Sequence, residues 1–121
     1  MRVQALRGAT TAAANEADAI AAATAELLEA MLTRNQLRPG DLISVVFTAT
    51  ADLNAGFPAA AARALGISDV PLLCAQEIAV PDALARCIRV LMHIQTEQGR
   101  DELRHVYLND ASELRSDLAE E

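Results

Sequence analysis

The stretch that most constrains the fold is residues 86–96, RCIRVLMHIQT, which alternates with the period of a β-strand. One face of this strand is wholly apolar and consists of Ile88, Val90, Met92 and Ile94. The other face places Arg89 between Cys87 and Leu91. An arginine in that setting either reaches water at the edge of a sheet or is held in a partly dry place, where it can bind an anion.

Length and composition bound the architecture. A chain of 121 residues predicts one domain, residues 1–121, because a single core is the rule well past this size. Apolar residues make up 52% of the chain but aromatic residues only 2%, so the core must be built from small aliphatic side chains that each bury little area. Self-association is therefore expected to supply further burial.

The charge argues against two classes of partner. A formal charge of -7 disfavours nucleic acid or an anionic membrane as the main partner. The first residues lack the apolar core of a signal peptide, and no apolar run approaches the length of a membrane span. Two cysteines do not make a disulfide framework. We therefore expect a soluble cytoplasmic protein with reduced thiols.

Patterning along the rest of the chain predicts an α+β fold. Strands are expected at 3–9, 42–50, 70–77, 86–96 and 104–108. Between them we expect a long helix with Asn15 as its N-cap, which ends before Pro39, and a short helix from Pro58 to Gly66. The strand at 42–50 is apolar throughout, so it is expected to be central and covered on both faces.

These elements fit a mixed five-stranded sheet with one long and one short helix on a single face. The other face, which carries Cys87 and Leu91, also has apolar character. Something must cover it, and another copy of the chain is the simplest candidate.

The polar residues set among these strands suggest a site for an anion. The two histidines and two cysteines have no metal-ligand spacing, and the phosphate-loop pattern is absent, so neither a metal site nor a phosphate-binding loop is expected. What remains is a set of arginines with one carboxylate, a thiol and a phenol: Arg7, Arg63, Arg89, Arg115, Glu77, Cys74 and Tyr107. Because arginine does not titrate near neutral pH, this set suits a dianion whose reaction moves no proton.

Several motifs, in order along nearly the whole chain, resemble one family. They are RGATT (7–11), TATADLNAGFPAAAAR (48–63), PLLCAQE (71–77), RCIRVLMHIQT (86–96), RHVYL (104–108) and LR (114–115). Together they resemble the monofunctional, trimeric chorismate mutases of the Bacillus type, which are distinct from the all-helical class with the same activity. The resemblance implies the Claisen rearrangement of chorismate to prephenate, in the shikimate route to aromatic amino acids, without a cofactor. It also implies a homotrimer with a pseudo-barrel of packed sheets and active sites at the subunit interfaces.

The resemblance also implies roles for individual residues. Arg89 would face the ether oxygen of the breaking bond, and Arg7 and Tyr107 would hold a substrate carboxylate. Glu77 and Cys74 would meet the ring hydroxyl and neighbouring atoms. Further residues would line or close the pocket, namely Phe57, Ala59, Arg63, Leu72, Leu73, Leu114 and Arg115. One position departs from a relative's pattern: Ala60 stands where that relative has a lysine, so a contact to a carboxylate is missing unless Arg63 replaces it.

Two other functions stay open at this stage. Small trimeric enzymes that hydrolyse reactive imines also use interface pockets with an arginine for a carboxylate. A non-catalytic module that binds a carboxylated metabolite is the second alternative, for which Ala60 is the only hint. Conversion of chorismate by the purified protein distinguishes the three.

Overall fold

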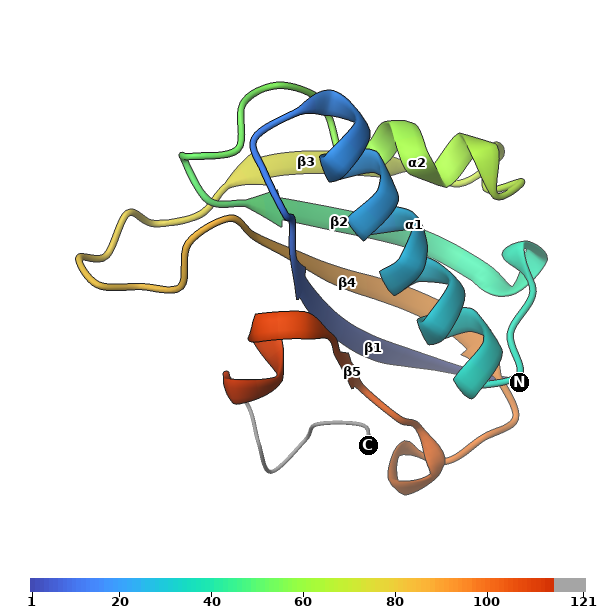
Figure 1. Cartoon of the computed structure of the whole chain (residues 1–121). Helices are drawn as coiled ribbons and strands as arrows, with labels where there is room; N and C mark the ends of the chain where they lie inside the picture. Colours follow the sequence, from blue (N-terminus) through green and yellow to red (C-terminus); the bar gives the residue numbers. More distant parts are fainter. Residues whose placement is uncertain (115–121) are drawn as a thin grey trace.

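The structure, a computed structural model, describes residues 1–114. Its elements are β1 (Arg2–Thr11), α1 (Ala17–Arg34), β2 (Leu42–Ala49), α2 (Ala59–Ala64), β3 (Leu72–Gln76), β4 (Cys87–Thr96) and β5 (Val106–Tyr107). Short 3-10 helices lie at Pro39–Asp41, Arg100–Glu102 and Asn109–Glu113. Figure 1 shows both α-helices on the same face of one sheet, with α1 crossing it and α2 beside β3 at the edge. The α+β fold with a long and a short helix on one face is confirmed.

The five strands lie in the order β3-β2-β4-β1-β5. β4 pairs antiparallel with both β1 and β2, whereas β2 with β3 and β1 with β5 are parallel pairs, so the sheet is mixed as expected. The prediction that residues 42–50 form the central strand is wrong, because β2 is second from the edge and β4 holds the centre. An apolar run alone does not separate these two interior positions.

Alternation along β4 divides the sheet into a helix-covered face and an open face. The apolar residues predicted for one side, Ile88, Val90, Met92 and Ile94, are each at most 1% exposed. They pack with buried residues of the other elements in two clusters on the helix side, which include Leu6, Leu27, Leu28, Met31, Val45 and Phe47. The open face carries side chains that the helices leave uncovered, among them Val3 (63% exposed), Leu73 (62%) and Leu91 (38%).

The start of α1 differs from the prediction. Glu16 occupies the N-cap position, without a side-chain hydrogen bond, and Asn15 lies one residue outside the helix. The Asn15 Oδ1 instead accepts hydrogen bonds from the backbone N–H groups of Asn54 and Ala55, both at 3.0 Å. Asn15 therefore holds the loop after β2 in place. The prediction that it caps the helix is wrong, because this tertiary contact occupies its side-chain oxygen. Within residues 1–114 no helix has the length and apolar character needed to cross a membrane.

Gly8 marks the closest approach of α1 to the sheet. A Cβ atom at this position would lie 2.6 Å from the sulfur of Met31 and 3.1 Å from a methyl carbon of Leu27. We expect Gly8→Ala to lower the free energy of unfolding by about 1–3 kcal/mol, because Met31 must leave its packed position. Gly40→Ala is the matched control, since a Cβ there meets nothing within 4 Å. Urea denaturation of the two variants checks this; equal stability would contradict the close packing described.

Candidate active site

The candidate site lies on the open face and follows one row of paired positions across all five strands. Thr48 of β2 is opposite both Ala75 of β3 and Arg89 of β4, and Ala9 of β1 is opposite both Arg89 and Tyr107 of β5. Residues paired in this way point to the same face of a sheet. The register therefore brings Arg89 and Tyr107 onto one surface, with only the small Ala9 between them.

Arg89 is held by an ion pair with Glu77, the residue just after β3. The guanidinium Nε donates to the Glu77 Oε2 at 2.9 Å. The Thr48 hydroxyl donates to the same oxygen at 2.7 Å. The Glu77 side chain is 14% exposed, whereas that of Arg89 is 43% exposed. The carboxylate thus anchors the Nε edge of the arginine and leaves the rest of the guanidinium open to a ligand.

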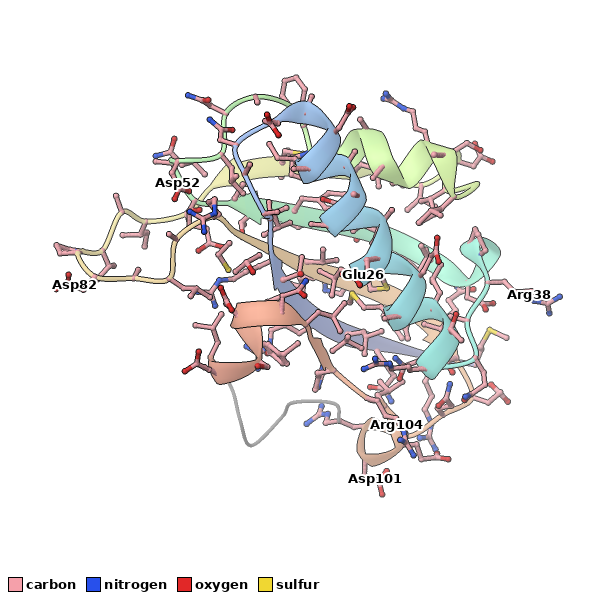
Figure 2. The ribbon with its side chains drawn as sticks, in the orientation of Figure 1. Glu26, Arg38, Asp52, Asp82, Asp101 and Arg104 are labelled. Atoms are coloured by element: carbon pink, nitrogen blue, oxygen red, sulfur yellow. The ribbon has the colours of Figure 1, made fainter. Side chains whose placement is uncertain are left out.

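The backbone around Arg89 is fixed by a second group of hydrogen bonds, at the turn that leads into β4. Asp52 accepts the backbone N–H of Arg86 with both carboxylate oxygens, at 2.9 and 3.2 Å. Arg86 has a positive φ of 50°, a conformation that needs such support. Hydrogen bonds, chiefly from the Thr50 hydroxyl, lower the pKa of Asp52. Asp52 lies at the end of the sheet from which the loop 78–86 projects (Figure 2).

Tyr107 contributes a phenol that lacks a partner. It is 3% exposed and packs with Ala9, Ala111 and Leu114. Within residues 1–114 nothing hydrogen-bonds its buried phenolic oxygen. A buried hydroxyl without a partner costs free energy, so this oxygen is a natural point for a ligand to accept a hydrogen bond.

Arg7 shares the open face two positions before Ala9 in β1. Its backbone N–H donates to the Nδ1 of His105 at 3.0 Å, just before the short strand β5 begins. His105 thus extends the pairing of β1 by one bond that β5 is too short to make. In the described part of the chain no hydrogen bond or ion pair engages the Arg7 guanidinium, which is partly buried.

A second group of predicted site residues lies elsewhere. Phe57 is 77% exposed, and with Cys74 it lines a hollow of about 450 Å³ beside the loop after β2. Ala59 and the exposed Arg63 belong to α2. Leu72 and Cys74 pack against the helix-side core, and Cys74 is paired with the buried Phe47. This group therefore lies on the helix side at the β3 edge.

One chain does not bring the two groups together. Arg7, Glu77, Arg89 and Tyr107 lie on the open face, with Leu114 packed beside Tyr107. Cys74 is separated from Glu77 and Arg89 by the sheet, because β3 side chains alternate between its faces. Leu73, a pocket residue expected from the sequence, lies on the open face and shares this surface with Arg89. Arg115 lies outside the described residues.

Two contacts at the site were not anticipated from the sequence. The hydroxyl of Thr48 and the imidazole of His105 each touch a predicted site residue. Alternation placed Arg89 on its face, but no local pattern indicates a partner 29 or 98 positions away. The thiol of Cys87, also near Arg89, is not poised for chemistry, because burial raises its pKa to about 11.

Comparisons with known proteins identify the family. The family model described as chorismate mutase type I matches residues 3–118. The chain is 42% identical over 120 residues to chorismate mutase AroH of Bacillus subtilis, covering 98% of this chain and 94% of that protein. It is 47% identical over 117 residues to chorismate mutase AroH of Thermus thermophilus, covering 96% of each.

A solved structure agrees with these relatives. The chorismate mutase from Clostridium thermocellum superposes with a TM-score of 0.89 at 49% identity, covering 90% of this chain and 97% of the other. These matches settle the choice among the three functions considered from the sequence. The chain therefore belongs to the chorismate mutase type I family, and its activity is that of a chorismate mutase, an isomerase.

Proposed function

We propose that this enzyme rearranges chorismate to prephenate around Arg89, in a site that a second copy of the chain completes. The observation that carries the proposal is the anchored guanidinium: Glu77 holds its Nε at 2.9 Å, while the side chain stays 43% exposed on the open face. In the described residues Glu77 is the one carboxylate that pairs with this guanidinium, and the buried Cys87 thiol is a further polar neighbour. The two Nη groups are therefore available to donate to a substrate anion.

The reaction is a unimolecular exchange of bonds. The ether C–O bond of chorismate breaks while a C–C bond forms between the enolpyruvyl methylene carbon and the ring, and the ether oxygen becomes the keto oxygen of prephenate. Atoms and charge balance without a proton transfer or a co-reactant. Such a step needs no group that titrates near neutral pH, so arginine, which stays protonated, suffices.

Arg89 accelerates the step by binding charge that appears only in the transition state. As the ether bond lengthens, negative charge builds on its oxygen, so a fixed cation there stabilises the transition state more than the ground state. A unit charge pair at 4 Å is worth about 4 kcal/mol at an effective dielectric constant of 20. Because the developing charge is partial, we assign about half of this value to catalysis. Glu77 holds the guanidinium in position toward the ether oxygen, and it accepts a hydrogen bond from the ring hydroxyl of the substrate.

The remaining rate acceleration comes from holding the enolpyruvyl arm folded over the ring. Arg7 and the unpartnered hydroxyl of Tyr107 would hold one substrate carboxylate. Arg63 would bind the other and replace the charge that Ala60 lacks. Cys74 would meet atoms next to the ring hydroxyl.

The second copy supplies the other half of the pocket. Phe57, Arg63 and Cys74 lie across the sheet from Arg89, so one chain alone cannot close them around a single ligand. The exposed apolar residues of the open face fit a cover made by another copy. We propose a homotrimer with a pseudo-barrel of packed sheets. In it Ala59, Leu72, Leu73 and Leu114 line each interface pocket, and Arg115 closes it.

The experiment that tests the function is direct incubation with chorismate. We expect prephenate to form without any added metal or cofactor, and the loss of the chorismate chromophore measures it. No formation of prephenate from chorismate by the purified protein would contradict the proposed reaction. A cytoplasmic location, a single domain over 1–121 and the lack of nucleic-acid or membrane partners stay predictions of the sequence.

A further inference from the structure

We propose that Thr48 is a positioning residue of the active site, which keeps Glu77 on the Nε of Arg89 and away from its Nη groups. This inference rests on the proposed function of Arg89 and Glu77. It starts from one oxygen, the Glu77 Oε2, which accepts both the Thr48 hydroxyl at 2.7 Å and the Arg89 Nε at 2.9 Å.

The convergence of two donors on one oxygen matters because a carboxylate usually meets arginine differently. Arginine and carboxylate pairs often form two parallel hydrogen bonds, one from Nε and one from an Nη group. Such a fork would occupy an Nη group that the ether oxygen needs. The terminal torsion of a glutamate is broad, so little in the side chain itself prevents this rotation.

Thr48 is placed to oppose that rotation. It lies directly across from Arg89 in the antiparallel pairing of β2 with β4, on the same face of the sheet. Its strand also fixes the Glu77 backbone, since the Glu77 N–H donates to the carbonyl of Ala49 at 3.0 Å. Neighbouring positions of β2 thus hold both ends of the glutamate.

The arrangement also assigns the two oxygens of Glu77 to different tasks. Oε2 is committed to Thr48 and Arg89. Within residues 1–114 no hydrogen bond or ion pair involves Oε1. Oε1 is then the atom that accepts the ring hydroxyl of the substrate, in a carboxylate whose side chain is only 14% exposed.

Thr48→Val tests this role, because valine matches threonine in shape but has no hydroxyl. We expect kcat/KM to fall by about ten-fold, mostly in kcat, because Glu77 turns toward the Nη groups and blocks the ether contact. Thr48→Ser keeps the donor and should restore activity to within about two-fold of the unmodified enzyme. Ser44→Ala is the matched control: it removes a hydroxyl from the same face of β2, next to His93 and not Glu77, and should leave kcat unchanged.

A double-mutant cycle separates positioning from folding. In a Glu77→Ala background, Thr48→Val should change kcat/KM by less than about two-fold, because its target is gone. An equal loss in both backgrounds would show that Thr48 acts on the fold, and it would overturn the proposal. So would full activity of Thr48→Val, or failure of Thr48→Ser to restore the rate. If the unmodified protein itself fails to convert chorismate, the proposed function falls as well; if it succeeds and the cycle fails, only the role of Thr48 is lost.

Discussion

Arg89→Ala is expected to lower kcat by about 30-fold, which is the rate equivalent of the roughly 2 kcal/mol assigned to its charge in the transition state. KM should change much less, because the lost interaction belongs to the transition state. The residues that bond to the Arg89 site cannot replace its charge, because neither Glu77 nor Thr48 is positive, and Arg7 on the same face is assigned to a substrate carboxylate. Steady-state kinetics with chorismate measure both parameters. A rise in KM with an unchanged kcat would contradict the role given to Arg89.

Two further variants make this result specific. Arg38→Ala removes an exposed arginine near the end of the molecule opposite the loop 78–86 (Figure 2) and should leave kcat unchanged. Arg89→Lys keeps the charge but lacks the Nε that Glu77 holds, so the cation is no longer aimed. We expect its kcat to lie between those of the alanine variant and the unmodified enzyme. Equal rates for the lysine variant and the unmodified enzyme would mean that charge alone suffices.

Mixing two damaged chains is expected to recover activity that neither has alone. Arg63→Ala should raise KM by roughly 10–100-fold, because it removes a charged hydrogen bond to a substrate carboxylate. Arg89→Ala damages the group on the open face, and Arg63→Ala damages the group at α2. If each site takes these groups from different copies, random trimers of the two variants contain some sites with both arginines. That share is about a quarter when the chains are present in equal amounts.

The measurement is the rate at low chorismate concentration for the co-expressed variants. We expect about a quarter of the unmodified rate for interface sites. Sites formed within one chain would always lack one arginine, and the mixture would then show only the average of the two damaged enzymes. That outcome would refute the shared site. The control is a chain that carries both substitutions and is expressed alone, since its trimers can form no intact site.

The strength of the alternation in β4 explains how far the sequence predicts this fold. A strand with four large apolar residues on one face has one stable orientation against the helices. The sequence therefore predicted correctly that Arg89 lies on the opposite face. The stripe of α1, with Leu27, Leu28 and Met31 fully buried, followed from its period in the same way.

Properties that depend on distant partners did not follow. Asn15 has the chemistry of an N-cap, but its oxygen binds a loop 39 and 40 positions away, and no local pattern shows which contact wins. Thr48 resembles any other β-branched strand residue until its hydroxyl meets Glu77. The rank of β2 in the sheet depends on β4 pairing with both β1 and β2, which only the assembled sheet reveals.

The central claim is that a fixed cation meets electron density that appears as one carbon–oxygen bond stretches. The most direct measurement is a crystal structure of the enzyme with a bicyclic ether dicarboxylate that mimics the transition state. The account predicts an Arg89 Nη group within about 3 Å of the bridging oxygen, the distance of a charge-assisted hydrogen bond, with Glu77 still on Nε. An Arg89 side chain turned away from that oxygen, in a site otherwise occupied by the inhibitor, would contradict it.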